Sequence, residues 1–422
     1  DAMREGKRIE KSASFWEDDL EWLDAEAARR KAGRSDILGE LIAEARGRAT
    51  GDDMVEMLVK RLESIERHVC AVRAAVSTEV QLPFLGDERR PKTWAERKAL
   101  VTHEDTKTRA KKTIDMLVDH GIQHVRTHVD VTDPTLSALK SMLEVREETR
   151  HLIDLQIVAF PQEGIESFKG GRELMTEAIA MGADVVGGIP HFENTRDQGV
   201  SSIKFLMDLA ERTGCLVDVH CDETDDPQSR FLEVLAEEAR VREMGERVTA
   251  SHTTAMGSYD NAYCSKLFRL LKLSKINFVS CPTESIHLQG RFDTYPKRRG
   301  LTRVAEIDRA GMNVCFGQDS IVDPWYPLGN GNILRILEAG LHICHMLGYE
   351  DLQRGLDLIT DNSARALALG DRYGLEVGRP ANLLILSAPD DYEMVRSQGH
   401  ALVSVRHGKV LMRRTPAQIE RA

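Results

Sequence analysis

Three observations in the amino-acid sequence predict an α/β fold, a (β/α)8 barrel of the TIM type with a small accessory β-sheet. From about residue 121 onward, short β-branched runs alternate with charged stretches that have the period of an α-helix. The runs recur at a spacing of roughly thirty residues, which is the length of one βα unit. Polar side chains follow the carboxyl ends of these runs, where α/β barrels carry their chemistry.

Seven apolar runs are the predicted parallel strands, and their low polarity suits strands that are buried on both faces. They span residues 123–131, 152–161, 183–190, 216–223, 247–254, 276–282 and 313–320. An open doubly wound sheet could also hold seven strands. The sequence contains no GxGxxG turn, which weakens that alternative.

The C-terminal part of the chain has a different pattern, and we expect it to add strands to the accessory sheet. Residues 96–370 form the predicted barrel, and residues 371–422 the predicted C-terminal strands. A short helix is expected at 361–367, and alternating strands at 379–387 and 401–412, with His407-Gly408 as a turn.

Residues 1–95 form an atypical N-terminal region that is rich in Ala, Glu, Arg and Leu. Helical spacing of apolar residues is found in segments 15–46 and 53–75. This pattern predicts helices but assigns the region no function.

Composition limits the classes of partner. The chain has 422 residues and a formal net charge of -11, so it has no basic excess to neutralise nucleic-acid phosphates. It has no run of 18 apolar residues and no recognisable leader, so we expect no membrane span and a cytoplasmic location. The 7 cysteines include no CxxC pair, which favours reduced, buried thiols. A small-molecule substrate is the remaining expectation, and a homo-oligomer is compatible with it.

His220, Glu223 and His252 are the first candidates for chemistry. His220 lies near the end of one predicted strand, Glu223 follows three residues later, and His252 ends the next strand. Histidines at a barrel mouth are natural metal ligands, and a neighbouring carboxylate can move protons between water and substrate. Taken singly, each histidine is more often a hydrogen-bonded core residue and Glu223 a surface residue. Their position on neighbouring strand ends favours a functional site.

Three more residues follow predicted strands. Asp319 ends the last strand, where it is either a metal ligand or the N-cap of the next helix. Gln162 carries an amide that can both donate to and accept from a pyrimidine-like ring, or it is an ordinary loop residue. Trp325 lies in the stretch Asp-Pro-Trp-Tyr-Pro and forms either a pocket wall or ordinary packing.

Taken together, these stretches resemble the bacterial cytosine deaminase family within the amidohydrolase superfamily. The resemblance runs from about Trp94 to the C-terminus, and HLQGRFDTYPKRRG is its longest specific segment. The matching segments are 94–100, 121–131, 153–164, 182–192, 217–223, 247–256, 287–300 and 316–329.

The resemblance implies a hydrolytic deaminase that uses one divalent metal, iron or zinc. It implies that His220 and Asp319 bind the metal, and that Asp319 also takes a proton from the attacking water. It further implies that Glu223 protonates the ring nitrogen, that His252 orients the attacking oxygen, and that Gln162 and Trp325 bind the substrate.

One departure from the family concerns the metal ligands. The family's first barrel strand carries a His-x-His pair that supplies two more ligands, and no His-x-His occurs in this sequence. Three explanations stay open: a non-catalytic homologue that binds a nucleobase or acts as a structural subunit, a site completed by other side chains, and an N-terminal reading that differs from the natural protein.

A second departure concerns the substrate. Ser320 follows Asp319 at a position where the best-known cytosine deaminases have a second Asp that faces the substrate. Serine is smaller and neutral, so it would accept extra bulk or a different ring substituent. The resemblance therefore implies cytosine or a related cyclic amidine such as isocytosine, a methylated cytosine or creatinine.

Overall fold

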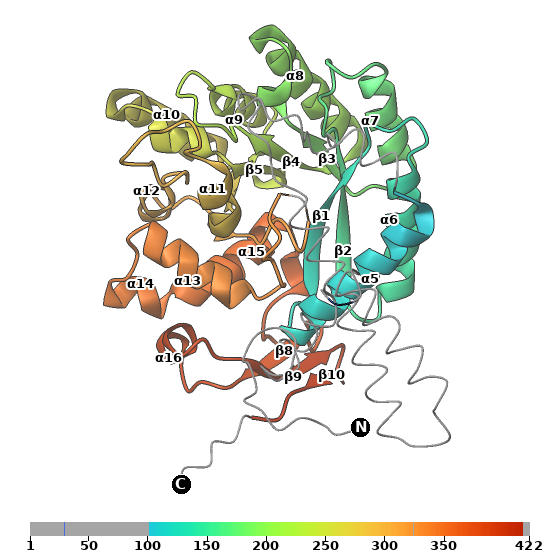
Figure 1. Cartoon of the computed structure of the whole chain (residues 1–422), viewed down its shortest axis with the longest axis vertical. Coiled ribbons are helices and arrows are strands. Elements are labelled where there is room, and N and C mark those ends of the chain that lie inside the picture. The colour runs from blue at the N-terminus through green and yellow to red at the C-terminus, as the bar shows by residue number, and fades with distance from the viewer. Residues whose placement is uncertain (1–28, 30–100, 324, 417–422) are drawn as a thin grey trace. The chain divides into compact units, whose positions relative to one another are not determined.

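The central element of the protein is a parallel β-sheet whose strands follow one another in sequence order (Figure 1). The structure is a computed structural model that describes residues 29, 101–323 and 325–416. All seven predicted strands are confirmed within a few residues. They are β1 (His124–Asp130), β2 (Asp154–Phe160), β3 (Val185–Gly188), β4 (Leu216–Cys221), β5 (Val248–His252), β6 (Asn277–Ser280) and β7 (Val314–Phe316).

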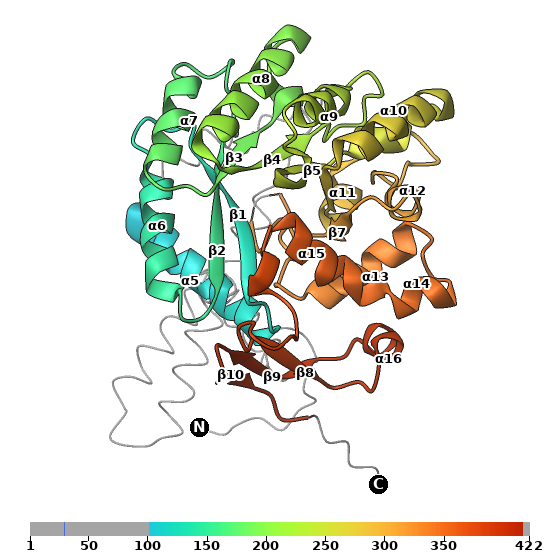
Figure 2. The same ribbon diagram turned by 180° about the vertical axis from the view of Figure 1, so that it is seen from behind.

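Helices cover the outer face of this curled sheet (Figures 1 and 2). Their starts follow local chemistry: the Thr195 side chain accepts from the backbone N–H of Gln198 at the start of α8, and Asp260 accepts from that of Tyr263 at the start of α10. The α-helices are α5 (His103–Asp119), α6 (Ser137–Thr149), α7 (Gly171–Ala180), α8 (Arg196–Thr213), α9 (Phe231–Val241), α10 (Asn261–Ser274), α11 (Pro282–Leu288), α12 (Val304–Arg309), α13 (Ile333–Ile343), α14 (Tyr349–Gln353), α15 (Asp361–Ala366) and α16 (Asp391–Arg396).

The alternation of side chains along each strand separates the hydrophobic core from the polar interior. In β4, Val217, Val219 and Cys221 belong to the core cluster between the sheet and the helices. Asp218 and His220 occupy the intervening positions and therefore face the concave side of the sheet. The same strand thus contributes both to the core and to the candidate site.

A closed ring of eight strands is not observed. Within residues 101–323 and 325–416, β1 and β7 are the outer strands of the parallel sheet, and an eighth parallel strand is absent. The structure therefore confirms a curled parallel sheet with a helical cover and a second, smaller sheet. The helix-rich segments predicted at 15–46 and 53–75 lie outside the described residues.

The accessory sheet is confirmed as an antiparallel unit in the order β10-β9-β8. Its strands are β8 (Leu383–Leu386), β9 (Ala401–Arg406) and β10 (Lys409–Arg413), and the predicted helix before it is α15. His407 and Gly408 both have positive φ (48° and 75°), as the tightest hairpin turns require. Gln123, just before β1, connects this sheet to the parallel sheet, because its Nε2 donates to Ser404 Oγ (3.0 Å).

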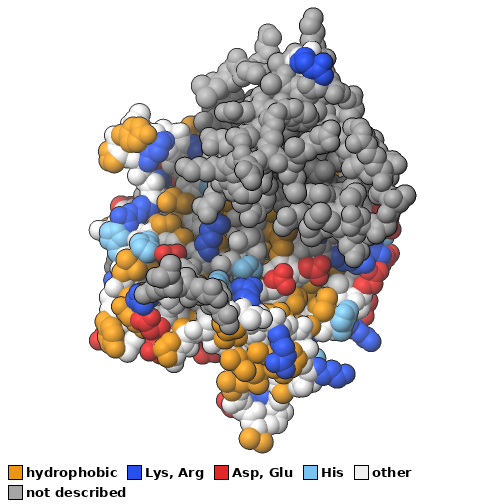
Figure 3. Space-filling view, turned by 60° about the horizontal axis from the view of Figure 1, so that its bottom comes forward, with side chains coloured by type: hydrophobic (Ala, Val, Ile, Leu, Met, Phe, Trp, Pro, Cys, Tyr) orange, Lys and Arg blue, Asp and Glu red, His pale blue; other side chains and the backbone are white. Residues whose placement is uncertain are grey.

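The described surface carries charges of both signs. On the face shown in Figure 3, Lys and Arg side chains are interspersed with Asp, Glu and hydrophobic side chains. Cysteines 215, 221, 264, 281, 315 and 344 are free thiols, as predicted, whereas Cys70 lies outside the described residues. Within the described residues, no helix combines the length and the apolar character that crossing a membrane requires.

Candidate active site

The carboxyl ends of β4, β5 and β7 bring three predicted residues together. His220, His252 and Asp319 each offer a ligand atom, and these atoms all lie within 4.8 Å of one another. The three residues are 32 or more positions apart in sequence, and only the parallel register of neighbouring strands places them side by side. The structure thus brings these three predicted residues together, and their role as one site stays a prediction.

His252 lies between two carboxylates. Its Nδ1 is 3.4 Å from Glu223 Oε1, and its Nε2 is 3.8 Å from Asp319 Oδ2. Burial alone would lower the pKa of His252, but Glu223, Asp319 and Asp218 outweigh burial and raise this pKa above its ordinary value. The ring can therefore exchange protons with either carboxylate while the site stays close to neutral.

His220 is surrounded by aromatic rings. Its ring centroid lies 4.3 Å from that of Phe160, 4.6 Å from that of His128 and 4.4 Å from that of His252. Burial, together with the charges of His252, His128 and His191, lowers the pKa of His220 well below its ordinary value. The imidazole is consequently neutral, which is the form that binds metals.

The donor set fits a divalent metal. The Nδ1 atom of His220 is buried and has no hydrogen-bond partner among the described residues. Buried polar atoms without partners are rare, and a metal ion is one group that such an atom would bind. A neutral imidazole such as that of His220, together with the carboxylate of Asp319, suits zinc and iron.

Glu223 has the properties of a proton-transfer group. Burial and the nearby charge of Asp319 raise its pKa, while His252 lowers it, with a net result of about 7. A carboxyl group with a pKa near the working pH can both donate and accept a proton during one reaction cycle. This location agrees with the proton-shuttle role predicted for Glu223, which stays a prediction.

A second buried carboxyl group, Glu284, faces the same site. It lies on α11, is 1% exposed, and has an Oε2 atom without a hydrogen-bond partner among the described residues. Burial, followed by the charges of Asp319, Asp323 and Glu223, raises its pKa to about 9. Ser320 lies close enough to Glu284 and Asp323 to lower the pKa of both carboxyl groups, so its side chain lies beside them in the site.

Beneath the site lies a group of polar residues that we call the Arg126–Asp218 network. It comprises Arg126, Gln156, Asp218, Thr249 and Ser251. Arg126 Nη1 donates to Asp218 Oδ2 (2.8 Å) and to Thr249 Oγ1 (3.2 Å), while its Nε donates to Gln156 Oε1 (3.1 Å). Ser251 Oγ donates to Asp218 Oδ1 (2.5 Å). The network holds β4 at Asp218, two residues before His220, and β5 at Ser251, one residue before His252.

The remaining predicted residues lie at the same edge of the sheet. Gln162 comes two residues after the end of β2, and Trp325 lies in the loop after β7, where its N–H donates to Asp323 Oδ1 (2.9 Å). Ser320 is buried beside Glu284 and Asp323. Their contacts with a substrate stay predictions.

Sequence reasoning missed Glu284 and favoured a structural role for His128. Glu284 lies within a short helix rather than at a strand end, so the strand-end rule did not select it. His128 lies two residues before the end of β1 and contacts the His220 ring. Residues two apart on a strand share a face, and His128 lies two residues before the strand end. This spacing was the signal in the sequence that could have placed His128 in the site.

The curled parallel sheet, with histidines and an aspartate at its carboxyl edge, is the arrangement of a metal-dependent hydrolase. An amidohydrolase family model matches residues 87–412, and the chain belongs to the amidohydrolase family.

Among solved structures, the chain is similar to 5-methylcytosine deaminase from Klebsiella pneumoniae, liganded with 5-fluorocytosine in one structure and with phosphonocytosine in another. The identity to the first is 76%, with a TM-score of 0.77, over 78% of this chain and 79% of that chain. N-isopropylammelide isopropylaminohydrolase from Burkholderia multivorans is 26% identical, with a TM-score of 0.66, over 79% of this chain and 82% of that chain. Among curated proteins, N-isopropylammelide isopropyl amidohydrolase from Pseudomonas sp. (strain ADP) is 28% identical over 74% of each chain.

Proposed function

We propose that the chain is a metal-dependent hydrolytic deaminase of cytosine-type cyclic amidines, with 5-methylcytosine as the substrate to test first. The observation that carries this proposal is the cluster of Glu223, His252 and Asp319 around the neutral ring of His220. Similarity at 76% identity to a 5-methylcytosine deaminase supports the substrate class. The small, neutral Ser320 agrees with a substituent on the ring.

The proposed reaction replaces the exocyclic amine of an amidine by oxygen. A water oxygen forms a bond to the amidine carbon, the bond from that carbon to the amine breaks, and ammonia leaves. Asp319 takes one water proton, and Glu223 delivers its proton to the ring nitrogen. The Glu223 carboxylate then takes the remaining proton from the newly bound oxygen and passes it to the departing amine, and the proton held by Asp319 restores Glu223 for the next cycle. His252, held between the two carboxylates, orients the attacking oxygen and stabilises the negative charge that develops there.

His220 and Asp319 are the proposed metal ligands, with His252 close enough to join them. A divalent metal, iron or zinc, would lower the pKa of water and polarise the attacked group. We also propose that the observed strands are part of a closed eight-stranded barrel. The unbroken parallel order β1 to β7 and the helices on one face support this proposal.

The test compares ammonia release from 5-methylcytosine, cytosine, isocytosine and creatinine by the chain and by Glu223→Gln. We expect kcat for the preferred substrate to fall by about 100-fold or more, because the variant cannot transfer a proton. Glu237→Gln, at an exposed position on α9, is the matched control and should retain full activity.

An alternative function is nucleobase binding without turnover, which the absent His-x-His pair favours. That alternative predicts a saturable affinity for cytosine, measured by calorimetry, without ammonia release and without any effect of Glu223→Gln. Ammonia release that depends on Glu223 would exclude it.

A further inference from the structure

The backbone that carries His252 has an unusual conformation. His252 (φ 66°) and Thr253 (φ 44°) are consecutive non-glycine residues in the left-handed region, and both are buried. A non-glycine residue in this region is strained and persists only where its surroundings enforce the conformation. Contacts from outside β5 must therefore stabilise this corner, the left-handed turn of the backbone at His252 and Thr253.

The segment Leu301–Arg303 contacts the corner directly. Thr253 Oγ1 donates to Thr302 Oγ1 (2.8 Å), and Thr302 Oγ1 in turn donates to Met256 Sδ (3.6 Å). Arg303 adds two backbone contacts, from its Nε to Met256 O (3.1 Å) and from its Nη2 to Tyr259 O (2.6 Å). The segment thus holds both ends of η3 (Thr254–Ser258), the turn that follows His252.

Close approach of the two segments depends on Gly257. A Cβ atom at this position would lie 2.3 Å from the carbonyl oxygen of Leu301, closer than real Cβ atoms come. The absence of a side chain therefore lets Leu301–Arg303 lie against η3. This complementarity is independent of the Thr253–Thr302 hydrogen bond.

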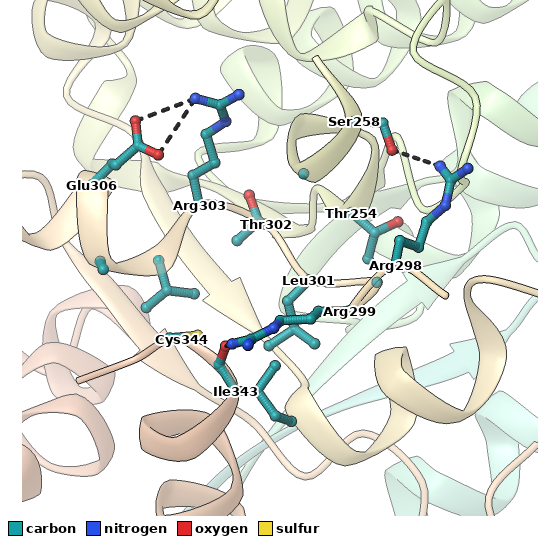
Figure 4. Close-up of a pocket in the computed structure, with 14 residues that line it drawn as sticks. Thr254, Ser258, Arg298, Arg299, Leu301, Thr302, Arg303, Glu306, Ile343 and Cys344 are labelled. Atoms are coloured by element: carbon teal, nitrogen blue, oxygen red, sulfur yellow. Dashed lines mark hydrogen bonds and ion pairs between the residues drawn. The ribbon is translucent and has the colours of Figure 1, made fainter. Parts of the chain in front are cut away.

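The outer side of this contact is hollow. A cavity of about 410 Å³ is lined by both segments, including Thr254, Gly257, Leu301, Thr302 and Arg303 (Figure 4). No side chains fill this space, so on this side the corner is restrained by the Thr253–Thr302 hydrogen bond and by the contacts of Arg303. On the other side, Thr254 Oγ1 and the Ala255 N–H donate to Asp222 O.

We propose that Thr302 is a positioning residue for His252. By accepting from Thr253, it holds the left-handed corner and so keeps the His252 ring between Glu223 and Asp319. The consequence for turnover rests on the proposed function. The effect of Thr302 on the backbone conformation at His252 and Thr253 is expected in the free chain as well, without metal or substrate.

The experiment uses Thr302→Val, which removes the acceptor at nearly constant volume, and Thr302→Ser, which retains it. Thr149→Val is the matched control, because Thr149 is also buried and donates to Val145 O (2.7 Å) within α6. The first measurement is amide hydrogen exchange of Ala255 in the metal-free chain, whose N–H donates to Asp222 O (3.0 Å). We expect about tenfold faster exchange in Thr302→Val and wild-type exchange in Thr302→Ser and Thr149→Val.

The second measurement is steady-state kinetics. We expect kcat of Thr302→Val to fall by about tenfold with KM nearly unchanged, and Thr302→Ser to restore it. Unchanged Ala255 exchange in a folded Thr302→Val chain would overturn the proposal. If Thr302→Val does not fold, Arg303→Met removes the two backbone contacts instead and must accelerate Ala255 exchange. A wild-type chain without turnover but with this exchange pattern would contradict the proposed function and leave the positioning role intact.

Discussion

The Arg126–Asp218 network and the candidate active site lie on the same strands, but they differ in whether their buried polar groups have hydrogen-bond partners. Arg126 donates through Nε, Nη1 and Nη2, and Asp218 accepts from Arg126 and Ser251. Two residues further along β4, the Nδ1 atom of His220 has no partner among the described residues, and neither does Oε2 of Glu284. The partnered groups stabilise the fold, whereas the groups without partners are available to a ligand.

The pKa values show the same contrast. The proximity of His128 (Nε2 to Oδ1, 3.7 Å) and the positive charge of Arg126 outweigh burial and lower the pKa of Asp218, so its carboxylate is charged and compensated. The pKa values of Glu223 and Glu284 are instead raised to about 7 and about 9, because burial outweighs what stabilises their charged forms. Perturbed carboxyl groups of this kind are typical of functional sites.

The largest effect that separates the two regions is expected for Asp218→Ala. Removing one partner of a buried ion pair leaves the charge of Arg126 uncompensated, so the free energy of unfolding should fall by about 3–5 kcal/mol. Urea denaturation measures this change. Asp208→Ala removes one of three acidic partners of Arg242 at an exposed position and should cost less than about 1 kcal/mol. Equal losses in the two variants would refute the distinction.

The next effect is stabilisation by metal. Zinc at a free concentration of about 100 times its Kd should raise the free energy of unfolding by about 2.7 kcal/mol, because it binds only the folded site. His220→Ala should abolish this rise, and His342→Ala, at an exposed position on α13, should retain it. Thermal unfolding with and without zinc provides the measurement. If zinc stabilised His220→Ala as much as the wild-type chain, the metal would bind somewhere other than at the proposed ligands.

The smallest effect concerns Glu284. The pKa of this group is about 9 in the folded chain and 4.5 as its ordinary value, so over this interval the folded chain keeps a proton that the unfolded chain loses. Stability must therefore fall as the pH rises from 4.5 to 9. Between about pH 6 and pH 7.5 the metal-free wild-type chain should lose about 2 kcal/mol more than Glu284→Gln. If the free energy of unfolding changed with pH equally in the wild-type chain and in Glu284→Gln, Glu284 would be ionised in the folded state.

The sequence predicted all seven parallel strands, α15 and the β9–β10 hairpin, because apolar runs and the His407-Gly408 turn are local signals. It also predicted the gathering of His220, Glu223, His252 and Asp319, because strand ends of a parallel sheet meet at one edge. The resemblance to cytosine deaminases extended this prediction to roles, which the proposed experiments address.

Long-range pairings could not be predicted in this way. Arg126 and Asp218 are separated by 92 residues, and neither has a local pattern that identifies the other as its partner. Glu284 becomes a site residue only because α11 packs it against Ser320 and the strand ends. The predicted eighth strand had no candidate run of its own, and the sheet observed in the described residues is likewise open between β1 and β7.

One contact of Arg126 has a consequence for the order in which the protein forms during synthesis. Its Nη2 donates to the carbonyl oxygen of Ala366 (2.8 Å), at the end of α15 and 240 residues further along the chain. All seven parallel strands must therefore be synthesised before the guanidinium of Arg126 can bind the carbonyl of Ala366. Contacts of such long sequence separation form late. The hydrogen bonds beneath the candidate site are thus completed only when synthesis has passed α15.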